Sequence, residues 1–535
     1  MKRALSMLLA SVLLVGILGA CTPPQPQQEV APPPSGNQAA PPPAGTTPTT
    51  PPAADPTPPQ AEGPTGTLII ATANETPSIA PARHNAAAGW NKNVMTHNGL
   101  FRGHYEDLAV VPDLVASWTA ISDVLFEFTL HEGVLFHNGE EMTAADVVAS
   151  WYYVRNYPDT RTVHLSALAI EQTDRYVFTL YTGVPNASLF FDLTGQGNFI
   201  MPQSLIESGH DFQTDPIGTG PFVFEDWRLG DSLTFRAFED YFDQDRFPSI
   251  ETITWRIIPE AASRTIALET GEVDLVVEVA YADIPRLEAH PNVTVFTRPG
   301  PAFHHLVLNN SLPQFENIYA RKAINMAIDQ EAMVAVAFDG LALATRAQVP
   351  ILFPGTTYEG VVPFDPEGAR ALLAEHNIDP ASLGFEMIAS TEERRRLAEV
   401  AQAQLLDIGI PTTIVMNDHA TTLARMNDGN YEAGFGMWSA SNLISVMRGV
   451  LHGGLHNRSR IYNAELDYLI DKAVATIDVD ARDAIFEEAS IIANRHVGNV
   501  PTHLALAIRA FNSDLRVPEI SPTGALNLNV VYWAR

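Results

Sequence analysis

The chain has 535 residues, and its 62 acidic residues outnumber its 32 Lys and Arg residues, which gives a formal charge of −30. A surface with this charge repels phosphate backbones, so nucleic-acid binding is excluded as a leading function. The 46% hydrophobic content is sufficient for folded cores, and at roughly 150 residues per domain the length predicts about three domain-sized units. The single cysteine, Cys21, excludes an intramolecular disulfide framework and any cysteine-rich zinc site.

The first residues form a targeting segment. Lys2 and Arg3 precede an apolar run that is too short for a stable bilayer span but is typical of a signal peptide. The run ends in Leu18-Gly19-Ala20-Cys21, which resembles a bacterial lipobox. We therefore expect residues 1–20 to be removed and Cys21 to be the lipidation site, with acyl chains such as palmitate holding the protein on the extracytoplasmic face of a bacterial membrane, in the periplasm or at the cell surface. An ordinary buried cysteine is the alternative interpretation.

Residues 21–66 are predicted to form a proline-rich disordered tether. Between Thr22 and Gly66 there are 16 prolines in 45 residues, no aromatic residue and three charged residues. Such a segment buries too little apolar surface to offset its ordering entropy. If it is extended as polyproline II, it spans on the order of 100 Å. We therefore assign it no binding site.

From Thr67 onward the sequence has a folded pattern of mixed α/β type. Thr143-Ala144-Ala145-Asp146 is predicted to cap a helix, Asp365-Pro366 to begin another, and Ser390 with Glu393 to open a third that ends at Gly409. The predicted strands cover 68–71, 124–130, 176–181, 232–238, 252–258 and 293–297. The other predicted helices are an apolar-spaced helix through 320–328 with Gly340 as a stop, then 464–477 and 481–497. The irregular alternation, without a detectable repeat, favours two α/β lobes over a barrel or propeller.

Several strings, in order along the chain, resemble the family 5 extracellular solute-binding proteins of ABC importers, which include oligopeptide, dipeptide and nickel-chelate binders. The similarity runs from about residue 67 to the C-terminus. The strings are Val111–Trp118, Phe126–Gly139, Met142–Ser150, Gly218–Phe222, Ala267–Leu275, Ala320–Asp329, Leu405–Ile410 and Asn463–Asp467.

This resemblance implies a two-lobe clamshell of the periplasmic-binding-protein type (class II) with an extra subdomain in lobe I. Lobe I would comprise residues 67–308, lobe II 309–508, and residues 509–535 would return to lobe I. The family's activity implies a monomeric, non-catalytic receptor without a cofactor, which binds a peptide or other small solute between its lobes and delivers it to ABC permease and ATPase subunits. A surface hydrolase, or a sensory or adhesive lipoprotein with the same fold, is the alternative.

The ligand is predicted to be neutral or anionic, or to be a peptide held mainly through backbone hydrogen bonds and its carboxylate. In peptide-binding relatives an aspartate near a tryptophan pairs with the peptide's amino terminus, but the similar segment here, Gly434–Ile444, keeps Trp438 and has no aspartate. Residues 433–464 contain no acidic residue, so no local carboxylate would offset the desolvation of an ammonium group. An acid from elsewhere, such as Asp418 or Glu432, is the open alternative.

Ligand contact is expected first from Trp438, whose flat face suits stacking. Its alternative role is that of a core tryptophan, and the paired histidines below could equally be ordinary strand residues. The remaining predicted ligand-binding residues, taken from the family's cleft segments, are Ser439, Asn442, Trp90, Asn91, Phe303, His304 and His305.

No catalytic or metal site is predicted. His131, Glu132 and His137 lack HExxH spacing and lie in a predicted strand and turn. His452 and His456 are four residues apart, but the two glycines between them indicate a loop. The chain has neither a Gly-x-Ser-x-Gly nucleophile elbow nor a phosphate-binding Gly-Lys-Ser/Thr loop.

Overall fold

The computed structural model describes residues 63–76, 78–81, 87–105, 109–156, 167–439, 442–451, 457–521 and 524–534. The predicted signal peptide, Cys21 and nearly all of the predicted tether lie outside these residues. The described residues all belong to one compact unit, Pro56–Arg535.

The largest sheet among the described residues has 11 strands. Its order is β15-β14-β16-β12-β17-β11-β1-β10-β9-β8, and β13 pairs with β17 beside this path. The strands are β1 (Thr67–Thr72), β8 (Phe222–Arg228), β9 (Ser232–Ala237), β10 (Thr252–Ile257), β11 (Leu275–Val276), β12 (Val293–Leu308), β13 (Leu343–Ala344), β14 (Phe385–Ala389), β15 (Thr412–Met416), β16 (Ala433–Ser439) and β17 (Asn499–Asn512).

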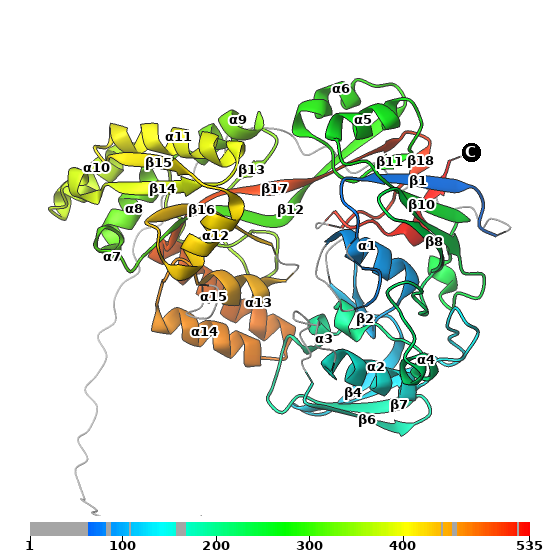
Figure 1. Ribbon diagram of the computed structural model, residues 1–535. Coiled ribbons are helices and arrows are strands. Elements are labelled where there is room, and N and C mark those ends of the chain that lie inside the picture. The colour runs from blue at the N-terminus through cyan, green and yellow to red at the C-terminus, as the bar shows by residue number, and fades with distance from the viewer. Residues whose placement is uncertain are drawn as a thin grey trace, which may run out of the picture. The chain divides into compact units, whose positions relative to one another are not determined.

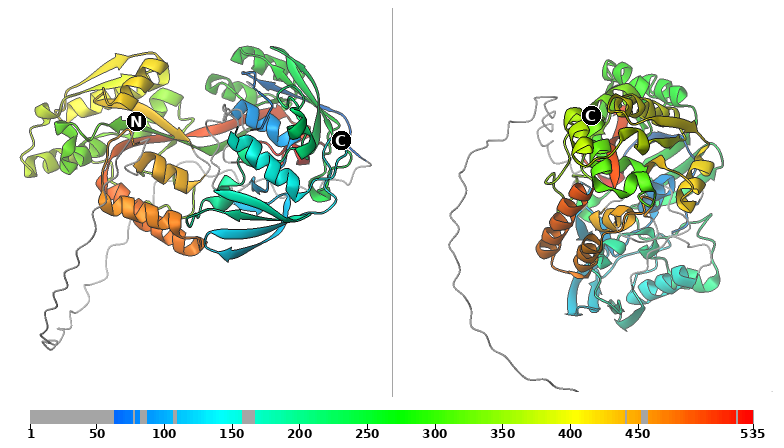
Figure 2. Two further views of the ribbon diagram at one scale, coloured as in Figure 1. Left: turned by 60° about the horizontal axis from the view of Figure 1, so that its bottom comes forward. Right: turned by 90° about the vertical axis from the view of Figure 1, so that its left-hand side faces the viewer.

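Strands β12 and β17 run through both parts of this sheet. The first half of β12 pairs with the end of β17, beside β11, whereas its second half lies between β16 and the start of β17. The register shifts between Pro299 and Phe303, where the two prolines Pro299 and Pro301 cannot donate ladder hydrogen bonds. Figure 1 shows these two long strands connecting two groups of elements, and a second view shows the same connection (Figure 2).

The first group of elements carries a separate four-stranded sheet in the order β4-β5-β7-β6. Aromatic side chains of its inner face, among them Phe126, Phe128 and Phe178, form a buried cluster with Trp151 of α2. The elements of this group are α1 (Ala87–Thr96), β2 (Phe101–Gly103), β3 (Val110–Pro112), β4 (Val115–Ser122), β5 (Leu125–Leu130), α2 (Ala144–Asn156), β6 (Ala169–Asp174), β7 (Val177–Tyr181), α3 (Leu189–Asp192), α4 (Gln203–Ser208), α5 (Ala261–Glu269), α6 (Ile284–Glu288), β18 (Leu515–Arg516) and β19 (Tyr532–Trp533).

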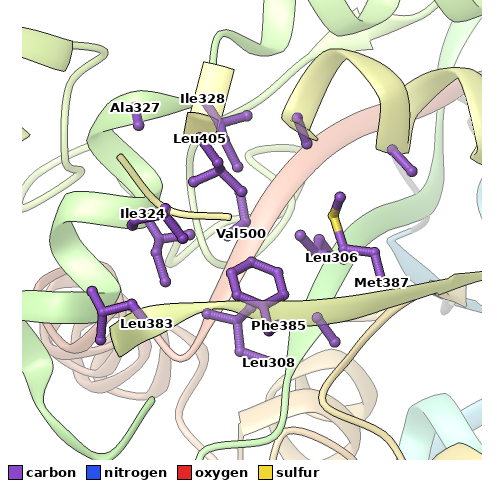
Figure 3. Packing of buried hydrophobic residues seen from close by; sticks show 14 of the residues in the cluster. Leu306, Leu308, Ile324, Ala327, Ile328, Leu383, Phe385, Met387, Leu405 and Val500 are labelled. Atoms are coloured by element: carbon purple, nitrogen blue, oxygen red, sulfur yellow. The ribbon is translucent and has the colours of Figure 1, made fainter. Parts of the chain in front are cut away.

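The second group packs helices on both faces of β14, β16 and β12. On one face Phe385 lies among Leu306, Leu308 and Val500, with α8 and α11 above them (Figure 3). On the other face a second cluster joins α13, α14 and α15. The helices of this group are α7 (Pro313–Glu316), α8 (Ile318–Ala327), α9 (Gln330–Phe338), α10 (Pro366–Glu375), α11 (Glu392–Asp407), α12 (His419–Asp428), α13 (Leu443–Val446), α14 (Ala464–Ala475) and α15 (Val479–His496).

Local capping signals predicted helix starts well. The Asp146 carboxylate accepts hydrogen bonds from the backbone N–H and hydroxyl of Thr143 at 2.7 and 3.0 Å, as expected of the capping box at α2. Asp365 accepts from the backbone N–H of Gly368 at 2.8 Å, with Pro366 as the first residue of α10. These elements form where the sequence predicts them because their own first turn supplies the stabilising contacts.

Three predicted elements differ from the structure. The predicted strand 293–297 is only the start of β12, because pairing with β17 continues past the prolines. The predicted helix that stops at Gly340 is two helices, α8 and α9, since Asp329 caps a new start by accepting from the backbone N–H groups of Glu331 and Ala332. The cap of α11 is Thr391 rather than Ser390.

Two buried histidines lie where the Gly218–Phe222 turn packs on the end of α1. A Cβ on Gly218 would lie 2.3 Å from the backbone oxygen of Thr96, so only glycine permits this approach. His97 contacts the Thr96 hydroxyl through Nδ1 at 2.8 Å, and His137 contacts the Gly220 carbonyl through Nε2 at 2.9 Å. Burial lowers the pKa of His97 to about 3 and that of His137 to about 4.

These shifts predict that acid destabilises the fold. Between the ordinary histidine pKa near 6.5 and the lowered values, the unfolded chain binds more protons, so the free energy of unfolding decreases as pH falls below about 6.5. Each histidine contributes up to about 1.4 kcal/mol per pH unit. Urea unfolding of wild type and His97→Gln at pH 7.5 and 5 should show a smaller pH-dependent loss in the variant. The exposed control His419→Gln should match wild type, and equal losses in all three proteins would contradict this prediction.

Candidate functional site

Strand β16 has an edge that its neighbour covers only in part. It pairs with β12 over its whole length, from Ala433 with Leu308 to Ser439 with Ala302. On its other side β14 pairs only with Ala433 and Gly434, because β14 ends at Ala389 and the chain turns into α11. Beyond Gly434, no strand of the described chain pairs with that edge. An extended segment could therefore add to the sheet there through backbone hydrogen bonds.

Trp438 lies on this part of β16. It is half-buried, and its ring packs against the cluster formed by α13, α14 and α15. A Cβ on Gly449 would lie 2.3 Å from Cζ2 of the Trp438 ring, so glycine at 449 allows this contact. Trp438 thus combines a packed face with partial exposure, and its predicted contact with ligand stays a prediction.

The three predicted residues on β12 differ in their surroundings. Phe303 faces Trp438 across the strand pair and is 1% exposed, so in this position it contacts the core. His305 is also buried, with its ring centroid 5.0 Å from that of Phe303. His304 points to the opposite face with its register partner Met437, and its ring stacks on His503 at 4.3 Å. His304 is half-buried, and therefore only this one of the three lies near the surface.

Ser439 and Asn442 flank the end of β16. Ser439 is exposed. Asn442 caps α13, since its Oδ1 accepts a hydrogen bond from the backbone N–H of Ser445 at 2.7 Å. The amide of Asn442 therefore has a structural partner already, which explains its presence independently of any ligand.

Trp90 and Asn91 lie on a different element, helix α1. Both are half-buried, and the Trp90 ring centroid lies 6.0 Å from that of Phe199. The structure therefore brings Trp438, Ser439, Phe303, His304 and His305 together on two paired strands, with Asn442 just beyond them, and places the α1 pair separately.

Arg394 is a candidate site residue that the sequence did not indicate. It stands in the first turn of α11, where the chain has just left β14, and its Nη1 donates to Ser390 Oγ at 2.8 Å. It lies within electrostatic reach of His304 and His503, and together with burial it lowers the pKa of His304 to about 4. Burial lowers the pKa of Arg394 itself, and Glu393 opposes that shift. Arg394 forms no ion pair within the described chain.

The two acids considered as possible ligand carboxylates have other partners. Asp418 caps α12 and accepts from the backbone N–H and hydroxyl of Thr421 at 2.9 and 2.6 Å, which lowers the pKa of Asp418. Glu432 accepts from the backbone N–H of Glu386 at 2.6 Å, at the opposite end of β16. Near the uncovered end of β16, Met437 pairs with the neutral His304, and Arg394 is the charged group that acts on this histidine.

Metal-ligand geometry is absent from the described residues, where no group of three or more His, Cys, Asp or Glu side chains could hold an ion. His137 is engaged by the Gly220 carbonyl. His452 and His456 lie outside the described residues. Within the same described ranges, no helix has the length and apolar character required to cross a bilayer.

Two α/β groups joined by shared strands are the arrangement of a periplasmic-binding-protein fold. The sequence profile of the bacterial extracellular solute-binding proteins, family 5, matches residues 109–446. The chain therefore belongs to this family, whose members are the solute receptors of ABC importers and not enzymes. The resemblance inferred from the ordered strings is confirmed.

Sequence relatives extend over most of the chain. Heme-binding protein A of Haemophilus influenzae is 26% identical over 479 residues, which cover 81% of this chain and 86% of the relative. The glutathione-binding protein GsiB of Salmonella typhi is 28% identical over 389 residues, which cover 70% of this chain and 75% of the relative.

Solved structures share the fold. HbpA2 from Haemophilus parasuis superimposes with a TM-score of 0.79 at 22% identity, covering 88% of this chain and all of that one (100%). DppA from Helicobacter pylori, in complex with the peptide STSA, gives a TM-score of 0.71 at 22% identity, and the superposition covers 88% of this chain and 98% of DppA. The predicted two-lobe α/β clamshell is thereby confirmed.

The cap geometry yields a prediction for Asn442. Replacing Asn442 by Ala should lower the free energy of unfolding by about 0.5–1 kcal/mol, because the backbone N–H of Ser445 loses its acceptor. Asn442→Asp keeps an acceptor and should retain most of that stability. Urea unfolding of both variants measures this, and equal stability of Asn442→Ala and wild type would contradict the capping role.

Proposed function

We propose that this protein is the lipid-anchored substrate-binding subunit of an ABC importer. It would bind a short peptide, or another small solute that carries a carboxylate, between its lobes and deliver it unchanged to a membrane permease. The proposal assigns lobe I to residues 67–308, lobe II to 309–508 and the C-terminal return to 509–535. The protein would act as a monomer on the extracytoplasmic face of a bacterial membrane, in the periplasm or at the cell surface.

The observations that carry this proposal are the partly uncovered edge of β16 and the presence of Arg394 within electrostatic reach of His304, which pairs with Met437 of β16. A peptide aligned with residues 436–439 would gain backbone hydrogen bonds from every second residue of this stretch, because the others direct their backbone groups to β12. Met437, 43% exposed, would meet the ligand surface. The edge supports recognition of an extended backbone.

Arg394 supports a ligand that carries a negative charge. A half-buried guanidinium that has a hydrogen bond to Ser390 but no ion pair in the described chain has lost part of its hydration, so a ligand carboxylate would add favourable electrostatics there. Neutral His304 adds a hydrogen-bonding group without adding a second fixed charge. The relatives include a glutathione-binding and a heme-binding protein, and a structure with a bound peptide shares the fold, which agrees with ligands that contain carboxylates.

Calorimetric titration with matched peptides tests the proposal. Dipeptides to tetrapeptides with a free C-terminal carboxylate should bind at least about tenfold more tightly than their C-terminal amides. Arg394→Gln should abolish that difference, whereas Arg396→Gln, an exposed arginine on the same helix, should preserve it. The recovered ligand should be chemically unchanged.

A preference for peptides with cationic ends, with no effect of amidation, would contradict the assigned charge. Turnover of the ligand would contradict the receptor role itself. These two outcomes separate an error in the ligand class from an error in the function.

Membrane attachment rests on Cys21 and is tested independently. In a bacterial host the wild-type protein should incorporate labelled palmitate, and its mature N-terminal peptide should begin at an acylated Cys21, because the thiol is the acceptor of the lipid. Cys21→Ser should incorporate no label, while the neighbouring Thr22→Ser should behave as wild type. A mature N-terminus at any other residue would contradict the anchor.

A further inference from the structure

The two groups of elements also meet away from the shared strands, where the loop before α3 approaches the end of α14. The backbone N–H of Ala187, in the first group, donates to the carbonyl of Val474, in the second group, at 2.9 Å. Ile477, which follows α14, packs against the buried cluster of the four-stranded sheet. Figure 1 shows α14 and α3 below the long strands, and Figure 2 again brings α14 close to the four-stranded sheet. The groups are therefore joined at a second place, separate from β12 and β17.

The loop that carries Ala187 is held by hydrogen bonds within itself. The hydroxyl of Thr182 donates to the carbonyl of Val184 at 2.7 Å, and Asn186 Oδ1 accepts from the backbone N–H of Ser188 at 2.9 Å. Such side-chain bonds to nearby backbone groups fix a turn. The backbone on both sides of Ala187 is thus ordered before the two groups meet, which lowers the entropy cost of the contact.

The end of α14 presents the acceptor. The last carbonyls of a helix have no donor within the helix. Here the backbone N–H of Thr476 donates to Ala473 at 3.0 Å, and Val474 receives Ala187 from the other group. Residues 476–478 then connect α14 to α15, and both helices are fixed in the same buried cluster of the second group. Ile477 is therefore carried by the second group while its side chain packs against the first.

The side chain of Ile477 supplies most of the stabilisation at this contact. A backbone hydrogen bond between the half-buried residues Ala187 and Val474 replaces bonds to water, so its net contribution is small. The half-buried Ile477 instead removes apolar surface from water where it touches the cluster of the other group. Separation of the groups would return this surface to water. The contact therefore favours a closed arrangement when no solute is bound.

We propose that Ala187 and Ile477 form a latch that holds the two lobes closed in the absence of solute and must open to admit it. A receptor that binds only after such an opening associates with its solute more slowly, in proportion to the fraction of molecules that are open. The latch itself needs no solute, whereas its effect on solute entry rests on the proposed function. Neither residue belongs to the candidate site on β16.

Hydrogen exchange at single-residue resolution tests the latch without any solute. In ligand-free wild type the amide of Ala187 should be protected, because its acceptor lies in the other lobe. Ile477→Asp should speed exchange of this amide about tenfold or more, since a carboxylate cannot remain against an apolar cluster. The amide of Ser188, which is bonded within the loop, should not change. Val479→Asp, a matched change at a position that is 54% exposed, should behave as wild type.

A cysteine pair tests the same contact if Ile477→Asp disturbs the loop itself, which would speed exchange at Ser188 as well. Ala187→Cys with Val474→Cys, in a Cys21→Ser chain that has no other thiol, should form a disulfide on mild oxidation, because the bonded backbones bring the two residues within bridging reach. Ala187→Cys with Glu465→Cys is the control, since this position lies roughly 13 Å further along α14. It should crosslink at least about tenfold more slowly.

Two results would overturn the latch. One is an Ala187 amide that exchanges in wild type as fast as an unstructured amide, or equally fast in wild type and in an otherwise intact Ile477→Asp. The other is a cysteine pair that crosslinks no faster than its control. Either result would show that the lobes are not held together at this place.

Stopped-flow binding of the tightest peptide of the calorimetric series tests solute entry. Ile477→Asp should speed association by the same factor as exchange at Ala187, because both rates follow the open fraction. The oxidised cysteine pair should associate at least about tenfold more slowly than its reduced form. Unchanged association in both proteins would overturn the role of the latch in entry. Failure of every peptide to bind would instead contradict the proposed ligand and leave the exchange result at Ala187 as the test of the latch.

Discussion

The pairing of β12 with β17 is the constraint on which the rest of the structure depends. These strands contribute to both parts of the large sheet, so the two groups of elements share backbone hydrogen bonds in addition to being joined by chain connections. The irregular register between Pro299 and Phe303 separates the two paired stretches. A rotation of one lobe against the other must therefore be absorbed by a few residues of these strands, which is the geometry expected of hinged ligand binding.

The site follows from where β14 ends. Had β14 continued beyond Ala389, it would have covered β16 through Ser439, and no strand edge would be available to a ligand. Instead, Thr391 caps α11 and turns the chain away, and the first turn of this helix carries Arg394 within electrostatic reach of His304. The start of α11 thus leaves the edge of β16 unpaired and also carries the positive charge of Arg394. In a chain with an overall charge of −30, a guanidinium group that forms no ion pair within the described residues is informative about the ligand.

Sequence patterns predicted the elements whose own residues fix their conformation. Asp146 and Asp365 begin helices through contacts within a few residues, and these starts were recognisable. The full length of β12 was not, because its prolines indicate a break and the strand is kept extended by its distant partners β16 and β17. Trp438 was indicated by resemblance, whereas Arg394 gave no signal, since it is the first of three consecutive arginines on an apparently solvated helix. Only the packing of α11 beside His304 distinguishes it from its neighbours.

The central claim is that solute adds to the exposed edge of β16 without being altered. Hydrogen–deuterium exchange of the full chain, with and without a saturating ligand recovered from the native host, tests it at the level of single peptides. The account predicts strong protection of the backbone amides of 436–439, together with weaker protection in β12 and β17 as the lobes close. Unchanged exchange at 436–439, with protection confined to other elements, would contradict it.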